Sequence, residues 1–240
     1  MPSGHDIFAT THWTVVQLAA RSDTARAQHA LSKLCEAYWY PLYVYVRRRG
    51  HGPEDAQDLT QEFFARLLAA QSLANLSAAK GKFRAFLLAS MNHFLADEWD
   101  RARALKRGGG AATISFDGMD PEQRYRCEPA DTSTPEKIYD RRWALDLLEQ
   151  ALKRLRADYE KAGMTALFEK LKITLTMGKG AVPLAQLAAE LRMTESAVKV
   201  AAHRLRARYR DVIYDQVAQT VSMRAEVEEE IRYLFSTLSA

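Results

Sequence analysis

Residues 184–210 constrain the fold most, because their pattern is that of two short helices joined by a tight turn. In the first helix, apolar residues recur at the spacing of one buried stripe: Leu184, Leu187, Ala188 and Leu191. Thr194 follows a two-residue turn and stands where the cap of a second helix belongs. The apolar positions of that second helix are Val198, Ala201, Ala202, Leu205 and Tyr209. Two short helices with such a turn are typical of a helix-turn-helix.

The second of these helices has a strongly basic outer face. It carries Lys199, His203, Arg204, Arg206, Arg208 and Arg210 against the single acid Glu195. A helix that lies beside DNA phosphates needs this excess of cations. An ordinary antiparallel helix pair with a solvated basic face would share the charge pattern. Alanines in both helices let the two backbones approach closely, which favours the helix-turn-helix.

Helical spacing also dominates the rest of the chain, and we expect an all-α fold. A helical domain should occupy residues 11–107, and a helix-turn-helix domain residues 135–212. Between them, residues 108–134 begin with a run of glycines and lack periodicity, as expected for a flexible linker. Residues 213–240 read as an amphipathic, acidic helical extension that completes the core of the second domain or has a regulatory role; we favour core completion. Pro41 should break or kink its helix.

An acidic face is predicted on a helix that starts at Pro53. Asp55, Asp58 and Glu62 fall on one side, roughly 120° from the apolar positions of the same helix. This face is either an ordinary solvated surface or a ridge that docks on a basic protein partner. Thr60 lies towards the apolar side, which makes it a poor phosphorylation site.

A long helix should follow the polar loop 72–82. Asn92, Trp99, Arg103 and Lys106 stay within about 40° of one another on it, so an amide, an indole and two cations form one stripe. Such a stripe suits stacking and reading of single-stranded bases. The alternative is that Trp99 belongs to the core. His93 and Asp97 have metal-pair spacing but lack further ligands, so we expect no metal and no cofactor.

The composition excludes several classes of protein. The net charge of +4 permits nucleic-acid binding without requiring it. Cys35 and Cys127 stand far apart and form neither a zinc motif nor a disulfide framework, which fits a reducing cytoplasm. The sequence has neither a long apolar run nor a secretion signal at its start, so we expect a cytoplasmic protein without a membrane partner.

Taken together, residues 34–210 resemble the extracytoplasmic-function group of the sigma-70 family of bacterial RNA polymerase sigma factors. The stretch PEDAQDLTQEFFARLL is similar to the one with which these factors grip the β′ clamp helices. The resemblance implies polymerase contacts by Asp55, Asp58, Gln61 and Glu62. The stretch LLASMNHFLADEWDRARALKR is similar to the helix that follows the pocket for a flipped minus-10 base, which the loop 72–82 would form. Asn92, Asp97 and Arg101 stand at matching positions.

The resemblance, combined with the stripe, gives the expected minus-10 contacts Asn92, Trp99, Arg101, Arg103 and Lys106. The helix-turn-helix resembles the minus-35 reader, with expected contacts Glu195, Ser196, Lys199, His203, Arg204 and Arg206. The implied function is promoter-specific transcription initiation together with core RNA polymerase, without enzymatic activity of its own. The sequence does not identify an anti-sigma factor or a kinase as a regulatory partner. Two alternatives stay open: a stand-alone helix-turn-helix regulator with a helical sensor domain, and a hydrolase built on helical His and carboxylate pairs.

Overall fold

A computed structural model describes residues 25–69, 82–104, 120–128, 131–177, 183–221 and 223–239. Every regular element in these ranges is a helix, which confirms the all-α prediction. The chain divides into two compact units, residues 1–145 with 217–240 and residues 146–216. In the described part of the chain, no helix has the length and apolar character needed to cross a membrane. The opening segment, the loop 72–81, Lys106 and the linker residues 107–119 lie outside the described residues.

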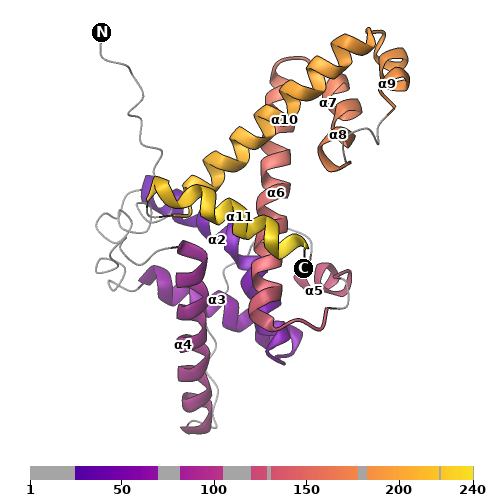
Figure 1. Ribbon diagram of the computed structural model, residues 1–240. Helices are drawn as coiled ribbons and strands as arrows, with labels where there is room; N and C mark the ends of the chain where they lie inside the picture. Colours follow the sequence, from indigo (N-terminus) through magenta and orange to yellow (C-terminus); the bar gives the residue numbers. More distant parts are fainter. Residues whose placement is uncertain are drawn as a thin grey trace, which may run out of the picture. The chain divides into compact units, whose positions relative to one another are not determined.

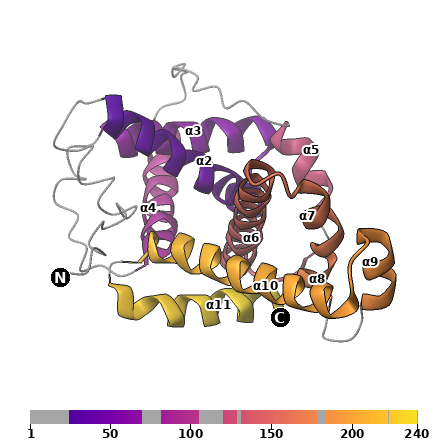
Figure 2. The same cartoon turned by 90° about the horizontal axis from the view of Figure 1, so that it is seen from above.

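The first unit is built on three longer helices with a largely aromatic core. These are α2 (Ala25–Arg48), α3 (Pro53–Ala69) and α4 (Phe83–Ala104), and α3 packs along α2 (Figure 2). The unit also holds α5 (Pro121–Arg126), the start of α6 (Pro135–Lys161), the 3-10 turn η3 (Arg224–Glu226) and α11 (Val227–Ser239). Its fully buried side chains include Tyr38, Tyr43, Tyr45, Phe64, Phe83, Leu87, Met91 and Tyr139.

Pro41 does not break its helix, because α2 continues through it from Ala25 to Arg48. A proline inside a helix costs roughly 3 kcal/mol. The neighbours Tyr38, Leu42 and Tyr43 are buried to 1% exposure or less, and burial of each large apolar side chain gains about 1.5–3 kcal/mol. Packing therefore outweighs the local cost, and the predicted break is wrong, whereas the alternative of a kink at Pro41 stays a prediction.

The second unit surrounds one apolar cluster. It contains the later part of α6, then α7 (Thr165–Leu171), α8 (Ile173–Thr176), α9 (Leu184–Leu191) and most of α10 (Glu195–Ala218). Figure 1 shows α7 and α9 gathered beside the first half of α10. The cluster joins Leu155, Tyr159, Phe168, Leu171, Leu187, Ala188, Val198, Ala202 and Leu205. The apolar stripes predicted for residues 184–210 thus face this core.

Local signals in the sequence fix several helix ends. α6 begins at Pro135, as predicted, and the Thr134 hydroxyl accepts a hydrogen bond from the Lys137 N–H at 3.4 Å. After α6, Gly163 takes a left-handed conformation with φ of 68°, which a glycine adopts at little cost. These two positions define a helix of 27 residues.

Candidate protein-binding and DNA-binding surfaces

Helix α3 presents the predicted acidic face because its other side is tied into the core. Ala56 and Phe64 are fully buried, and the buried Thr60 hydroxyl donates to the Ala56 carbonyl at 2.7 Å. Pro53 stands at the first helical position and the following acids favour the positive end of the helix. Asp55 and Asp58 are exposed as a result.

Helix α4 forms the facing wall. Phe94 is buried and contacts Phe63 of α3 edge to face, with ring centroids 5.8 Å apart. Arg66 of α3 pairs with Glu98 of α4 at 2.8 Å and also with Glu62 on its own helix. The guanidinium of Arg66 lies 5.0 Å from the centre of the Phe94 ring. These contacts hold the two helices in register beside each other.

An open groove of about 600 Å³ lies between these helices and is called the α3–α4 groove below. Its apolar lining comes from Leu59, Leu95, Ala96 and Trp99, and its acidic lining from Asp55, Asp58, Glu62, Glu98 and Asp100. Arg49, His51 and Asn92 complete the wall. Five carboxylates and one arginine line the groove, and Arg66 outside the lining pairs with two of these carboxylates, Glu62 and Glu98, so the groove is acidic overall. It is suited to a cationic partner.

The structure separates the four residues expected to contact polymerase. Asp55 and Asp58 are exposed, whereas Glu62 is half-buried and paired with Arg66. Gln61 is only 7% exposed, so its side chain is not available on the surface. The resemblance assigned Gln61 by its place in the motif, but that position faces the core here.

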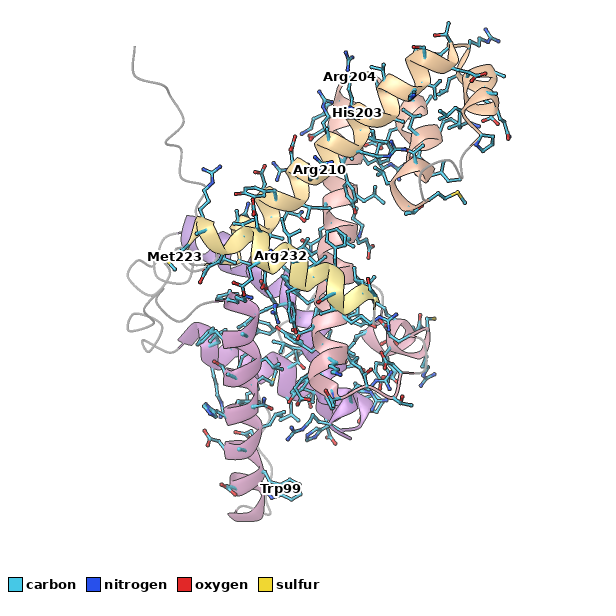
Figure 3. The ribbon with its side chains drawn as sticks, viewed as in Figure 1. Trp99, His203, Arg204, Arg210, Met223 and Arg232 are labelled. Carbon is cyan, nitrogen blue, oxygen red and sulfur yellow. The ribbon has the colours of Figure 1, made fainter. Side chains whose placement is uncertain are left out.

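The residues of the expected minus-10 stripe differ in their surroundings. Asn92 is half-buried, and its side-chain oxygen accepts a hydrogen bond from the Tyr45 hydroxyl at 2.5 Å. Burial raises the pKa of Tyr45, which keeps that hydroxyl a donor. Trp99 is 64% exposed and projects from the C-terminal end of α4 (Figure 3), so the alternative that it belongs to the core is wrong. The side chains of Arg101 and Arg103, and all of Lys106, lie outside the described residues.

His93 and Asp97 are both exposed on α4. Within the described residues, no group of three or more His, Cys, Asp or Glu side chains is placed to hold a metal ion.

In the second unit, α9 and α10 are joined by a three-residue turn. Arg192 adopts a left-handed conformation with φ of 53° and ends α9, because its N–H reaches the carbonyls of Ala188 and Ala189. The Thr194 hydroxyl accepts a hydrogen bond from the Ala197 N–H at 3.2 Å, as expected for the predicted cap of α10. The turn therefore supplies hydrogen-bond partners for some of the backbone groups at the end of α9 and the start of α10.

The basic residues of α10 fall into two sets. Lys199, His203 and Arg204 are exposed, and within the described part of the chain their side chains make no hydrogen bond or ion pair. Figure 3 shows His203 and Arg204 on the side of α10 that points away from α9. Glu195 and Ser196 are exposed at the start of the helix.

Arg206 is engaged within the protein: its Nε donates to the Thr174 carbonyl at 3.1 Å. It therefore supports the end of α8, and at most part of its guanidinium is available to a phosphate. Arg208 lies with its guanidinium 5.7 Å from the centre of the Tyr159 ring. The sequence pattern does not separate these two arginines from the other cations of α10, because all of them lie outside the apolar stripe.

A charged cluster that sequence reasoning missed holds the C-terminal tail to the first unit. Glu230 of α11 is fully buried and accepts a hydrogen bond from the Arg84 Nε at 2.5 Å, while Arg84 also pairs with Asp140 of α6. Tyr233 donates its hydroxyl to Asp140, and Lys82 pairs with Glu230 at 3.0 Å. Against the cost of burial, Glu230 and Asp140 raise the pKa of Arg84, so this guanidinium stays charged.

The tail thus packs in the first unit, and the expectation that it completes the core of the second is wrong. The backbone contributes as well, since the Phe83 N–H at the start of α4 donates to the Thr220 carbonyl at 2.9 Å. Arg84, Asp140 and Glu230 come from segments far apart in the chain. A single sequence carries no signal that pairs them.

Part of the expected linker is a short helix packed on α2. Glu122 of α5 accepts hydrogen bonds from the Arg47 Nε at 3.0 Å and from the Tyr43 hydroxyl at 2.8 Å. Tyr40 donates to Glu128 at 2.9 Å, and the Arg124 guanidinium lies 3.8 Å from the centre of the Tyr40 ring. Residues 120–128 are therefore anchored by side-chain contacts, which an analysis based on periodicity could not detect in a six-residue helix.

In a comparison with known families, residues 34–105 match the model of sigma-70 region 2. The matched residues include α3, α4 and every residue that lines the α3–α4 groove. The match supports a sigma-70 family sigma factor, a class of protein that binds core RNA polymerase and promoter DNA. No curated protein and no solved structure matches the chain.

Proposed function

We propose that this protein is an extracytoplasmic-function sigma factor that brings core RNA polymerase to specific promoters and is not itself an enzyme. The match of residues 34–105 to sigma-70 region 2 carries the proposal. The same residues form an open, acidic groove, which is the kind of surface that a polymerase-binding domain needs. A sigma factor acts where the polymerase acts, and this places the protein in the cytoplasm.

The polymerase contact is assigned to the exposed acids of α3. Asp55 and Asp58 are free of ion pairs among the described side chains, and Glu62 lies beside them in the groove. Unpaired carboxylates attract a basic partner and set the rate and register of docking. The β′ clamp helices of the polymerase are the proposed partner, as the resemblance of this stretch to known sigma factors implies.

Promoter recognition is assigned mainly to α10. Lys199, His203 and Arg204 project from an exposed face that is anchored by the apolar cluster of the second unit. In a helix-turn-helix, such cations lie on phosphates and fix the register of the helix in the major groove, where Glu195 and Ser196 would meet bases of the minus-35 element. Arg101 and Arg103 of the last turn of α4, together with Lys106 further along the sequence, remain the proposed contacts to melted minus-10 DNA.

The stand-alone helix-turn-helix regulator is the less favoured reading. It predicts tight binding to duplex DNA in the absence of polymerase, and it gives no reason for a region 2 match.

The proposal is tested by binding of the full-length chain to sigma-free core RNA polymerase. Asp58→Arg reverses an exposed charge in the groove, and we expect it to weaken binding at least about tenfold, which is ~1.4 kcal/mol. Glu54→Arg is the matched control, because Glu54 is exposed on the same helix but does not line the groove. A native chain that does not bind core polymerase would show that the proposed function is wrong.

A further inference from the structure

One large apolar side chain of α10 is left outside the core. Val200 is 47% exposed, whereas Val198 and Leu205 of the same helix are fully buried in the second unit. Among the residues of α10, all of which the structure describes, Val200 is the exposed large apolar side chain. A β-branched residue is less favourable than alanine on a solvated helix surface, so neither helix formation nor core packing accounts for Val200.

The position of Val200 around the helix axis indicates what it can contact. With about 100° of rotation per residue, Ser196, Val200 and Ala207 lie within about 40° of one another, and they are called the outer strip below. The middle of the outer strip lies roughly opposite to the buried Val198 and Leu205. A helix-turn-helix packs the inner face of its second helix on the domain and inserts the opposite face into the major groove. The outer strip is therefore the part of α10 that reaches deepest into the groove.

Cations stand on both sides of the outer strip. Lys199 and His203 lie about 40–80° to one side of its middle, and Arg204 lies about 60° to the other side. All three side chains are exposed. The phosphates of the two DNA strands line the two edges of the major groove, so cations on both sides suit contacts to the backbone. The uncharged strip between them then faces the edges of the bases.

A valine side chain can recognise one feature of these base edges. It has neither a hydrogen-bond donor nor an acceptor, so it gains nothing from the polar groups that the bases present. Among the four ordinary bases, thymine alone carries an apolar group in the major groove, its C5-methyl group. Contact between this methyl group and those of a valine removes apolar surface from water on both sides.

We propose that Val200 selects a thymine in the minus-35 element through contact with the C5-methyl group of that base. Lys199 and Arg204 fix α10 on the backbone, and Val200 adds a preference for thymine at one position, which contacts to phosphates cannot supply. The inference rests on the proposed function and names one base contact within it.

The test uses a promoter that the native chain transcribes with core polymerase, mapped by its start site. In synthetic duplexes of this promoter, each thymine of the minus-35 element, on either strand, is replaced in turn by deoxyuridine, which lacks only the C5-methyl group. Affinity for the full-length chain assembled with core polymerase is measured at one salt concentration. We expect one replacement to weaken binding about three- to fourfold, which is the effect of one buried methyl group.

Two variants assign this effect to Val200. Val200→Ala should bind the unmodified duplex at least about threefold more weakly than the native chain, and its affinity should change less than about 1.5-fold on that replacement. Alanine suits an exposed helical position, so this variant keeps the fold. Ile173→Ala removes another exposed β-branched side chain, in α8 of the same unit, and should be as sensitive to deoxyuridine as the native chain.

Equal affinity of the native chain for every modified duplex would overturn the inference while leaving the proposed function intact. A Val200→Ala chain that distinguishes thymine from deoxyuridine as well as the native chain does would overturn it too. A native chain that transcribes no promoter with core polymerase would instead reject the proposed function, and this inference with it.

Discussion

Arg84 joins three parts of the first unit that are distant in sequence. Its guanidinium pairs with Asp140 of α6 and Glu230 of α11, and it lies 4.1 Å from the centre of the Tyr233 ring. Arg84 is 6% exposed and Glu230 is fully buried. A buried ion pair contributes little net stability when it is complete, but loss of one partner leaves an uncompensated charge in the core.

Replacing Arg84 by leucine should therefore be severely destabilising. We expect Arg84→Leu to lower the free energy of unfolding by about 3–5 kcal/mol, measured by urea denaturation. Arg141→Leu is the control, because Arg141 is 45% exposed and pairs with Asp131 at 3.4 Å. The control should cost no more than about 1 kcal/mol. A similar loss in both variants would show that the buried cluster has no special role.

The Glu122 carboxylate should make the stability contributed by α5 depend on pH. Burial acts to raise the pKa of Glu122, but hydrogen bonds from Arg47 and Tyr43 outweigh it and lower that pKa below its ordinary value. A carboxyl with a lowered folded-state pKa adds stability above its unfolded pKa of about 4.3, and this stability is lost as pH falls through the folded-state value.

The difference in urea midpoint between the native chain and Glu122→Gln should accordingly be largest near pH 7. It should shrink as the pH falls below about 4, where Glu122 takes up its proton. Glu54→Gln at an exposed position of α3 serves as the control and should change the midpoint little. A difference that stays constant from pH 7 to pH 3 would contradict the assigned role of the carboxylate.

Single residues also mark the limit of prediction from sequence. Helical spacing placed Asp55 and Asp58 on the surface and Thr60 in the core, and the structure agrees. It did not distinguish Arg206, which donates to Thr174, from Arg204, which is exposed on the same helix. The difference depends on a neighbour 32 positions earlier in the chain, and no local pattern encodes it.

At the scale of elements, the ends of the helices could be predicted from nearby residues. Which helices pack against one another could not. Pro135, Gly163 and Thr194 stand at predicted helix ends, because caps and backbone conformations depend on nearby residues alone. The packing of α11 beside α4 and α6 depends on long-range ion pairs instead. Short helices such as α5 give too few residues for a periodic signal.

Removal of the tail should loosen the start of α4. A chain ending at Ala218 lacks the Thr220 carbonyl that accepts from the Phe83 N–H, and it also lacks Glu230. Amide hydrogen exchange in residues 83–91 should become at least about tenfold faster. Local opening of this segment costs less free energy in the truncated chain, since these two contacts no longer have to be broken.

Two comparisons make this result specific. Glu230→Gln should produce a smaller increase at the same amides, and residues 198–205 of the second unit should exchange at the native rate in both variants. Unchanged exchange in residues 83–91 after truncation would show that the tail does not hold α4.

The exposed cations of α10 should determine how strongly binding to duplex DNA depends on salt concentration. Each phosphate contact adds about 0.9 to the magnitude of the slope of log K against log salt concentration. Arg204→Ala should thus reduce that magnitude by about one for promoter DNA bound by the full-length chain. Arg156→Ala, at an exposed position of α6 that pairs with Glu160 and Glu169, should leave the slope unchanged. An unaltered slope for Arg204→Ala would remove Arg204 from the DNA interface.

For the whole molecule, the proposed function places one polymerase-binding groove and one DNA-binding helix on a single chain. Two contacts on one chain raise the effective concentration of the second contact once the first has formed, so neither needs to be tight alone. The sequence predicted both surfaces, since each depends on charge at helical spacing. It did not predict that Trp99 and the acids of α3 line one groove, because that requires the packing of α3 on α4.

Run-off transcription tests the central claim most directly. The purified chain is mixed with sigma-free core polymerase and fragmented genomic DNA of its source organism, and transcripts are mapped to their start sites. We expect transcripts from a defined set of promoters with the native chain and with Glu54→Arg, and a strong reduction with Asp58→Arg. Absence of new transcripts with the native chain, although it binds core polymerase, would contradict the assignment as an initiation factor.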